Sequence, residues 1–172
     1  MTRNYLKTLV FTLVSCLSGA TINVPADYST VQSGINASSN GDTVLVQSGL
    51  YYENIDFGGK DILLRGFGSQ TTIIDGRDLG SVIKIESGEQ NVVIFGFTIQ
   101  NGNASLGGGI SIKNNSSAVI QNCIIKDNHG RFSAALAFHG PTQRISIENA
   151  LARKDILTEA AKQLADSLFN ED

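Results

Sequence analysis

Two stretches of this sequence share one pattern: residues 91–102 (NVVIFGFTIQNG) and residues 117–128 (SAVIQNCIIKDN), which begin 26 residues apart. Superposing them places Val93 on Val119, Ile94 on Ile120 and Ile99 on Ile125. In both stretches short apolar runs alternate with polar residues and end at Gly, Asn or Asp. Self-similarity at this period is typical of proteins that stack one structural unit many times. The chain is therefore expected to be a repeat protein.

The same unit extends along the chain in both directions. Residues 61–67 (DILLRGF) match its start 30 residues earlier, and residues 81–86 (SVIKIE), 108–113 (GGISIK) and 134–139 (AALAFH) match one another at spacings of 27 and 26. Alignment gives two apolar columns and two intervening ones: Ile83, Ile110 and Leu136; Ile85, Ile112 and Phe138; Lys84, Ser111 and Ala137; Glu86, Lys113 and His139. Because side chains alternate across a strand, we expect the apolar columns to face inward and the others outward.

Strands of four to five residues, separated by turn residues and stacked rather than paired as hairpins, predict an all-β fold. The expected architecture is a single-stranded parallel β-helix of four to five coils, each of about 26 residues. Residues 144–149 (RISIEN) form a weaker last copy, with Ile147 on Ile120. A helical pattern also fits from Ser146 onward, so both interpretations stay open.

Both ends of such a solenoid need a cover. Residues 29–32 (STVQ) fit a capping box and predict a short amphipathic helix over residues 29–37, lying across the first coil. At the other end, residues 156–169 carry apolar residues at 4-3-4 spacing and predict a helix that could close the last coil. The expected organisation is a β-helix domain over residues 21–140, then a weak last coil, a C-terminal helix, or both, over residues 141–172.

The N-terminus has the pattern of a bacterial export signal. Arg3 and Lys7 precede an apolar run over residues 9–17, and Ser18-Gly19-Ala20 supplies small residues for cleavage. We expect residues 1–20 to be a signal peptide and the mature protein to be secreted or displayed on the cell surface. Alternatively, residues 13–16 (LVSC) resemble a lipobox, in which Cys16 would carry a lipid anchor. No apolar run approaches the roughly 18 residues of a membrane span, so no transmembrane segment is expected.

The composition limits the kinds of partner that the protein is expected to bind. The 172 residues carry a formal net charge of -3 and show no basic stretch, so a nucleic-acid partner is not expected. Removing residues 1–20 would leave Cys123 as the one cysteine, which excludes an intramolecular disulfide. Cys123 falls in the column of Phe97 and is therefore expected to be a buried, inert thiol.

Residues 22–54 (INVPADYSTVQSGINASSNGDTVLVQSGLYYEN) resemble the opening of right-handed parallel β-helix proteins of the pectin-lyase-like superfamily. An initial strand, a capping helix, G-D-T-V-x-V and G-x-Y-x-E-N occur in the family's order, and the resemblance extends over about residues 21–128. It implies a right-handed coil. The superfamily includes pectate lyases, pectin methylesterases, polygalacturonases, phage tailspikes and many non-catalytic surface proteins, so the resemblance predicts the fold more specifically than the function.

Matching the family's catalytic residues one at a time assigns no catalytic, cofactor-binding or metal-binding site. Gly49, Tyr51 and Glu53 match a G-x-Y-x-E of pectin methylesterases but are better interpreted as the start of a strand. Residues 128–131 (NHGR) and 138–140 (FHG) match only one of the polygalacturonase motifs. Residues 75–78 (DGRD) could contribute to a calcium site, although a turn is favoured, and His129 and His139 are expected to be loop residues.

General acid/base hydrolysis needs two carboxylates about 5 to 9.5 Å apart. None of the outward columns stacks two acids: Phe95, Gln121 and Glu148; Asn101, Asp127 and Lys154; Glu86, Lys113 and His139. The sequence therefore favours an exported module, interpreted as a short or truncated member of its family, with a structural, adhesive or glycan-binding role and an extracellular or surface polysaccharide as its partner. The alternative is a carbohydrate-active enzyme, pectate lyase-like or glycoside hydrolase-like, or the N-terminal fragment of one.

Overall fold

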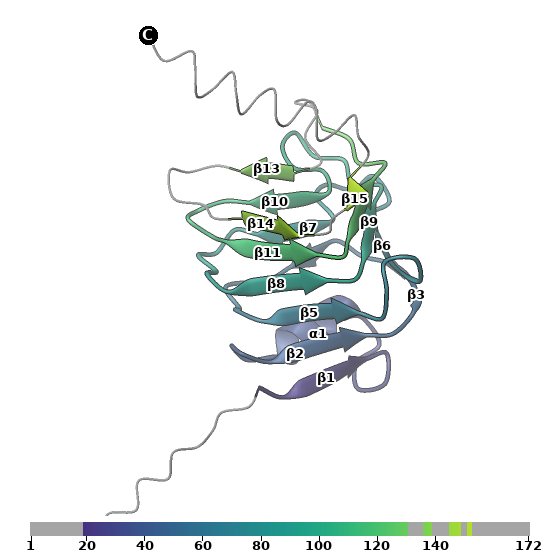
Figure 1. The fold of residues 1–172 in the computed structure, drawn as a ribbon, viewed down its shortest axis with the longest axis vertical. Helices are drawn as coiled ribbons and strands as arrows, with labels where there is room; N and C mark the ends of the chain where they lie inside the picture. Colours follow the sequence, from purple (N-terminus) through teal and green to yellow (C-terminus); the bar gives the residue numbers. More distant parts are fainter. Residues whose placement is uncertain (1–18, 131–135, 139–144, 149–150, 153–172) are drawn as a thin grey trace, which may run out of the picture.

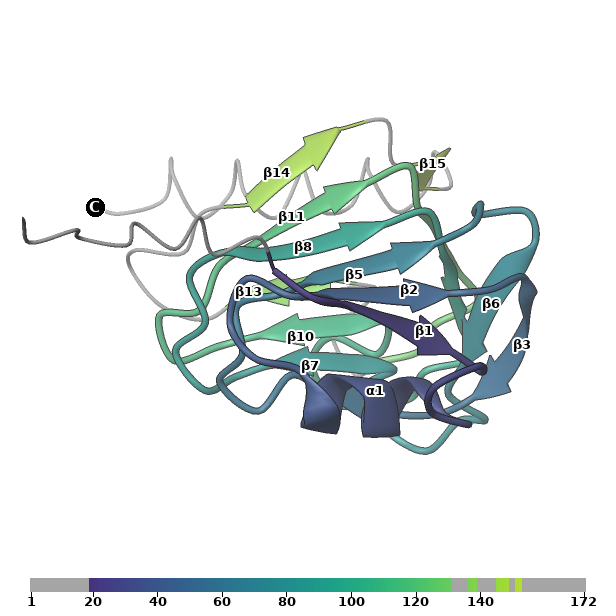
Figure 2. The ribbon, with the colours of Figure 1, turned by 90° about the horizontal axis from the view of Figure 1, so that it is seen from below.

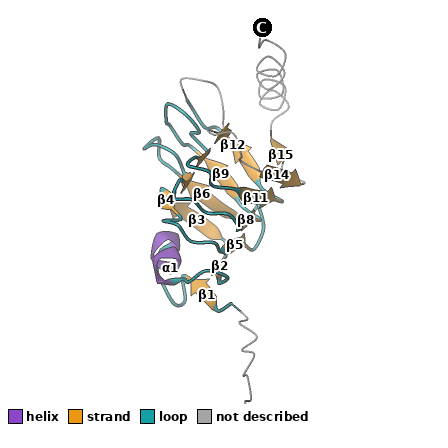
Figure 3. Cartoon of the chain, turned by 90° about the vertical axis from the view of Figure 1, so that its left-hand side faces the viewer, coloured by secondary structure: helices purple, strands orange, loops and turns teal. Residues whose placement is uncertain are grey.

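The strands of the protein wind into a parallel β-solenoid of about four turns (Figure 1). The computed structural model describes residues 19–130, 136–138, 145–148 and 151–152. Each complete turn contributes one strand to each of three parallel sheets, here called sheets A, B and C. Figure 3 shows these strands stacked above the one helix of the described residues, α1 (Val31–Ala37). The predicted all-β parallel β-helix is confirmed.

The three sheets have the following strands, in the order in which neighbours pair. Sheet A contains β1 (Thr21–Val24), β2 (Thr43–Val46), β5 (Leu63–Gly66), β8 (Val92–Phe95), β11 (Ala118–Gln121) and β14 (Ile145–Glu148). Sheet B contains β3 (Gly49–Tyr52), β6 (Thr72–Asp75), β9 (Thr98–Gln100), β12 (Ile124–Lys126) and β15 (Leu151–Ala152). Sheet C contains β4 (Ile55–Asp56), β7 (Ile83–Ile85), β10 (Ile110–Ile112) and β13 (Leu136–Phe138).

The register between strands is the one predicted by the repeat. Ile120 lies opposite Ile94, and Ile110 lies between Ile83 and Leu136. In the last copy, Ile147 lies opposite Ile120, so residues 145–148 form a strand of sheet A and not the start of a helix. The predicted C-terminal helix over residues 156–169 and most of the predicted signal peptide lie outside the described residues.

The inward columns form one continuous core. Their side chains are fully buried from the first coil to the fourth, among them Val44, Leu64, Ile94 and Ile120 of sheet A, Ile74 and Ile99 of sheet B, and Ile83, Ile85, Ile110 and Ile112 of sheet C. In these coils sheets A and B meet at a two-residue corner, whose first residue is Gly96 (φ of 80°) in one coil and Asn122 (φ of 51°) in the next. Glycine and asparagine tolerate this left-handed conformation, which explains the placement of both residues at the corner.

Helix α1 begins two residues later than the sequence predicted. Its N-cap is Thr30 and not Ser29, because Thr30 and Ser33 form the reciprocal capping box: the Ser33 N–H donates to Thr30 Oγ1 (3.1 Å), and the Thr30 N–H donates to Ser33 Oγ (3.3 Å). The helix packs closely on sheet A because Gly34 has no side chain; a Cβ there would lie 3.0 Å from Cγ2 of Val24.

Charged groups from the second coil hold both ends of this helix. The Glu53 carboxylate accepts hydrogen bonds from the Val31 and Gln32 N–H groups (2.9 and 2.8 Å), and Lys60 Nζ donates to the Ile35 carbonyl (2.7 Å). A negative group at the N-terminus and a positive group at the C-terminus complement the helix dipole. The predicted placement of the helix across the first coil is confirmed (Figure 2).

Two strand edges at this end are closed by side chains. The Gln32 amide pairs with both backbone groups of Asp56 at the edge of β4 (2.7 and 2.9 Å), and Asp27 accepts the Asn23 N–H at the edge of β1 (2.7 Å). Satisfied edge groups are poor templates for pairing with another chain.

In the described part of the chain, no helix has the length and apolar character needed to cross a membrane.

Candidate functional site

The outer faces of the three sheets differ in chemistry. On sheet C, Asp56, Lys84 and Ser111 lie in register, and Glu86 and Lys113 follow directly after their strands. Sheets A and B mix apolar and polar residues at their outward positions: Leu63 and Val93 lie on sheet A with Arg65, and Leu50 and Ile73 lie on sheet B with the polar column of Asp75, Gln100 and Lys126. On sheet C the outward residues Asp56, Lys84 and Ser111 are all polar or charged.

Four of these residues form a connected group, which we call the sheet C cluster: Lys84, Glu86, Ser111 and Lys113. Glu86 Oε1 accepts hydrogen bonds from Ser111 Oγ (2.5 Å) and Lys113 Nζ (2.9 Å). Glu86 Oε2 has no partner among the described residues and is left to accept a further hydrogen bond. Ser111 lies in an outward column, as predicted, but its side chain is fully buried and is used to hold Glu86 in place.

The cluster keeps Glu86 ionised. Partial burial by itself would raise the pKa of Glu86, but the hydrogen bonds from Ser111 and Lys113 and the positive charges of Lys113 and Lys84 outweigh it and lower the pKa below its ordinary value. At neutral pH Glu86 is therefore a hydrogen-bond acceptor and not a proton donor.

A surface hollow of about 340 Å³ lies beside the cluster. Its lining consists of Gly80, Ser81, Lys84, Glu86, Ala104, Ser105, Leu106 and Lys113. Lys84 is exposed and has no ion pair within the described residues. An exposed ammonium group at the edge of a hollow attracts an anionic group of a ligand.

The loop that contributes Ala104, Ser105 and Leu106 to the hollow is held by backbone contacts. The Asn103 N–H donates to the Gly80 carbonyl of the preceding coil (2.8 Å), and the Ala104 N–H donates to the His129 carbonyl of the next (3.2 Å). Gly102 permits the loop to close, because a Cβ there would lie 1.8 Å from the Gly108 carbonyl oxygen. The hollow therefore has a fixed wall.

Most other carboxylates are used to hold the coils together. Within residues 19–130, every Asp and Glu except Asp78, Glu86 and Asp127 accepts a backbone N–H: Asp27, Asp42, Glu53, Asp56, Asp61, Asp75 and Glu89. The buried Glu89 links three coils through the Gly59 N–H (2.9 Å), the Ser87 N–H (2.8 Å) and Ser116 Oγ (2.7 Å). Within that range the sheet C cluster thus has one carboxylate, whereas acid/base hydrolysis of a glycosidic bond uses two.

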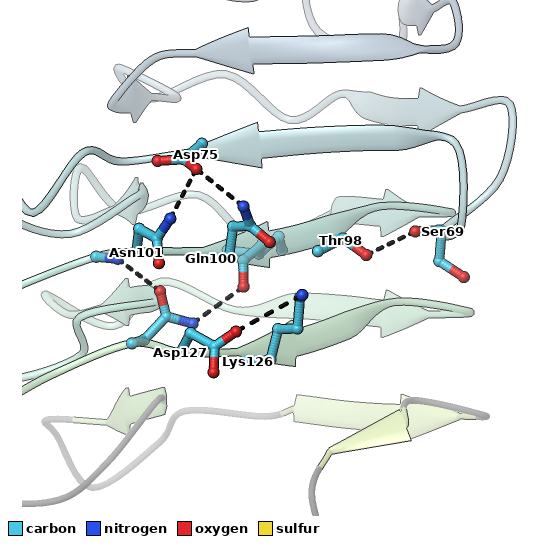
Figure 4. Close-up of polar contacts among 10 residues, drawn as sticks. Ser69, Asp75, Thr98, Gln100, Asn101, Lys126 and Asp127 are labelled. Atoms are coloured by element: carbon cyan, nitrogen blue, oxygen red, sulfur yellow. Dashed lines mark hydrogen bonds and ion pairs between the residues drawn. The ribbon is translucent and has the colours of Figure 1, made fainter.

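Of the candidate calcium residues 75–78, Asp75 ends β6 and the next three lie in a turn, in which the Leu79 N–H donates to the Gly76 carbonyl (3.0 Å). Asp75 is buried and accepts a hydrogen bond from the Arg77 N–H (2.9 Å). Figure 4 shows its other two hydrogen bonds, from Gln100 Nε2 (2.8 Å) and Asn101 Nδ2 (2.7 Å). Burial would raise the pKa of Asp75, but these hydrogen bonds and the charge of Arg77 outweigh it and lower the pKa. No group of three or more His, Cys, Asp or Glu side chains suited to a metal ion occurs in the part of the chain that the structure describes.

The G-x-Y-x-E match has a structural explanation. Tyr51 Oη donates to the Gln47 carbonyl (2.9 Å), a Cβ at Gly49 would lie 3.3 Å from the Tyr51 ring, and Glu53 caps α1. These contacts support the interpretation of the motif as the start of a strand.

The remaining sequence candidates lie apart from the hollow or outside the described residues. Cys123 is buried, as predicted, and burial raises the pKa of its thiol, which makes the reactive thiolate scarce. His129 is an exposed loop residue whose N–H donates to the Gly102 carbonyl (2.7 Å). Three further candidates fall outside the described residues: Arg131, His139 and Lys154. The motifs at residues 128–131 and 138–140, and the columns that end in Lys154 and His139, are therefore described only in part. No pattern in the sequence predicted the hollow, because residues from three separate segments of the chain form it.

Comparison with known proteins finds solved structures with a similar fold. No protein-family model matches the sequence, and no curated protein is significantly similar to it. A pectin methylesterase crystallised as a variant in complex with a hexasaccharide is similar in structure, with a TM-score of 0.57 and 13% identity over 78% of this chain and 48% of that one. The pectin methylesterase PemA from Erwinia chrysanthemi gives 0.47 and 13% over 77% and 47%.

The class of the protein follows from the strand topology and the first of these comparisons. It has the parallel β-helix fold of the pectin-lyase-like superfamily, as the sequence predicted. The chain spans about half the length of the pectin methylesterases that it matches.

Proposed function

We propose that this protein binds an acidic polysaccharide on the outer face of sheet C. The observation that carries the proposal is the exposed Lys84 ammonium, which has no ion pair within the described residues and lines a hollow of about 340 Å³. A sugar carboxylate at Lys84 would neutralise this charge. Glu86 Oε2 is then placed to accept a hydrogen bond from a neighbouring hydroxyl, with Lys113 and Ser111 holding the Glu86 carboxylate.

Binding without cleavage fits the residues better than catalysis. Glu86 is kept ionised by its neighbours, so it is a poor proton donor to a glycosidic oxygen. Within residues 19–130, no second carboxylate belongs to the cluster. The similarity in fold to a pectin methylesterase complexed with a hexasaccharide supports a carbohydrate as the ligand.

We also propose that the protein acts outside the cytoplasm, where such polysaccharides occur. The proposal depends on the apolar run over residues 9–17 followed by Ser18-Gly19-Ala20. Mass spectrometry of the mature protein tests it: a chain starting at Thr21 supports a secreted form, an acylated Cys16 supports surface anchoring, and an intact N-terminus contradicts export.

Titration calorimetry with a charged oligogalacturonate tests the binding proposal. Lys84→Ala should weaken binding at least several-fold, and added salt should weaken binding to the unmodified protein. Lys126→Ala is the matched control, because it removes a similar charge from the outer face of sheet B and should leave the affinity unchanged. Equal affinities for both variants would contradict a site on sheet C.

The same samples separate binding from catalysis. Absorbance of unsaturated products and an assay for reducing ends should show no turnover, with or without added calcium. Turnover that is lost in Lys84→Ala would favour a carbohydrate-active enzyme at this site and would contradict the non-catalytic role.

A further inference from the structure

The outer face of sheet A carries a single charge among uncharged and mainly apolar side chains. Arg65 of β5 is the one charged residue at the outward positions of β1, β2, β5, β8 and β11. It lies in register between Leu45 of β2 and Phe95 of β8. Phe67, directly after β5, is 62% exposed. An apolar and aromatic surface with one charged group has the composition of a ligand site.

This part of the face is also hollowed. A groove of about 390 Å³ has a lining that includes two aromatic residues, two threonines and one arginine: Phe67, Phe95, Thr21, Thr43 and Arg65. This volume lies within the range of about 300–1,000 Å³ that is usual for small-ligand sites. The hydroxyl groups of Thr21 and Thr43 make no hydrogen bond with a described residue, so they can pair with a ligand.

Arg65 is positioned to receive an anion. Its guanidinium carbon lies over the Phe95 ring, 5.4 Å from the ring centre, and it forms no ion pair with a described carboxylate. The planar fork of an arginine matches a carboxylate through two parallel hydrogen bonds made at its edge. Because the ring takes only a face of the guanidinium, the edge stays available to a carboxylate in the groove.

We propose that this groove binds one uronate residue of an acidic polysaccharide, with its carboxylate on Arg65 and its ring on Phe67. The inference rests on the proposed function, which supplies the polysaccharide, and it adds a second site on another face of the protein. Charge complementarity favours this ligand, because the groove has one guanidinium and each uronate ring has one carboxylate.

The rest of the sugar fits the groove as well. The C–H groups of a sugar ring carry a slight positive charge and pack on the negative face of an aromatic ring such as Phe67. Thr43 lies two residues along the strand and one strand away from Arg65, which puts their Cα atoms about 8 Å apart. One sugar ring with its carboxylate can span this distance and place a hydroxyl group at Thr43.

The two sites belong to opposite faces of the solenoid. Figure 2 shows sheets A and C on opposite sides of the core, and their inward side chains, such as Ile94 and Ile110, are fully buried between them. A single sugar ring therefore cannot contact Arg65 and Lys84 together. Two sites on opposite faces allow one protein molecule to bridge two polysaccharide chains.

Amide nuclear magnetic resonance of the full chain, titrated with trigalacturonate, observes each site separately. The amides of Gly66 and Phe67 should shift as well as those around Lys84. Arg65→Ala should weaken the response of the Gly66 and Phe67 amides at least several-fold and leave the response around Lys84 unchanged. Arg77→Ala is the matched control, because Arg77 stacks over Tyr52 on sheet B as Arg65 stacks over Phe95, and both responses should persist.

The failure of each proposal has its own result in this titration. A response around Lys84 without one at Gly66 and Phe67 would overturn the sheet A site and leave the proposed function in place. A response at Gly66 and Phe67 without one around Lys84 would support the groove and contradict binding on sheet C.

A neutral ligand tests the pairing with Arg65. Fully methyl-esterified trigalacturonate keeps the sugar rings and removes their charges, so it should lose most of the response of the Gly66 and Phe67 amides. An undiminished response would overturn the contact between the carboxylate and Arg65.

Light scattering of polygalacturonate without calcium tests the bridging of chains. The unmodified protein should increase the scattering several-fold over that of either component alone. Arg65→Ala should abolish the increase, because each molecule then keeps only the site on sheet C, and Arg77→Ala should preserve it. An equal increase with Arg65→Ala and with the unmodified protein would overturn bridging through the groove.

Discussion

At the scale of single residues, the surroundings of a carboxylate decide its role. Glu89 is buried among two backbone N–H groups and a hydroxyl, and it joins three coils. Glu86 lies at the surface between Ser111 and Lys113 with one oxygen left to accept a hydrogen bond. The two residues are three positions apart in the chain, and one serves the fold whereas the other is available to a ligand.

Asp75→Asn should destabilise the protein by about 1–3 kcal/mol, because the amide cannot accept all the hydrogen bonds made to the carboxylate. The pKa of Asp75 lies below its ordinary value of 3.8, so its stabilisation is complete above that pH and is lost as the pH falls through the lower, folded-state value. Urea unfolding of both proteins at several pH values measures the difference, which should shrink in acid. Asp78→Asn, at an exposed neighbour, should change little; a loss equal to that of Asp75→Asn would contradict this account.

Asp56→Asn should strengthen the binding of an acidic oligosaccharide. Asp56 lies in register with Lys84, and its charge opposes the approach of a carboxylate. Removing that charge should raise the affinity a few-fold at low ionic strength and less at high ionic strength, as measured by calorimetry. Unchanged affinity at low salt would show that the ligand does not approach the Lys84 column.

The sequence predicted where these residues lie but not which of them form a site. The repeat placed Lys84 and Ser111 in one outward column and Glu86 and Lys113 in the next, and the structure confirms both placements. It could not predict that Ser111 is buried against Glu86, or that the loop with Ala104 and Leu106 forms a wall, because these depend on contacts between segments far apart in the chain.

At the scale of elements, local patterns were sufficient for the strands and insufficient for the helix start. Alternation fixed the register of β7, β8, β10 and β11, since a shift of one residue would expose their apolar columns. Ser29 and Thr30 are both good N-cap residues by sequence. Ser33 and the distant Glu53 decide between them, and the contribution of Glu53 has no local signal.

Glu53→Gln should loosen α1 by about 1 kcal/mol, because it removes a negative group from the helix N-terminus. Thermal unfolding should show the loss, and hydrogen exchange should increase at the Val31 and Gln32 amides. Lys126→Gln removes a charge from an exposed pair and should have little effect. Undiminished protection of the Val31 and Gln32 amides in Glu53→Gln would mean that Glu53 does not cap the helix.

Ile94→Asp should cost several kcal/mol, because it buries an unpaired charge in the middle of the core. Lys113→Ala removes one partner of a surface ion pair and should cost at most about 1 kcal/mol. Denaturant unfolding of the two variants compares them, and similar stabilities would contradict the assignment of inward and outward columns.

At the scale of the whole molecule, three sheets share one core and present three different faces. The core needs apolar columns in every coil, which is why the repeat is evident in the sequence. The outer faces have no such constraint, so sheet C can carry charges and sheet A an apolar groove without any change in the fold.

The central claim is that an acidic polysaccharide binds on sheet C. Nuclear magnetic resonance of the protein with its lysines ¹³C-dimethylated, which keeps their charge, tests it directly during titration with a charged oligogalacturonate. The resonances of Lys84 and Lys113 should shift with the ligand, whereas those of Lys60 and Lys126 should stay in place. Shifts confined to Lys60 or Lys126, or no shifts at all, would contradict the claim.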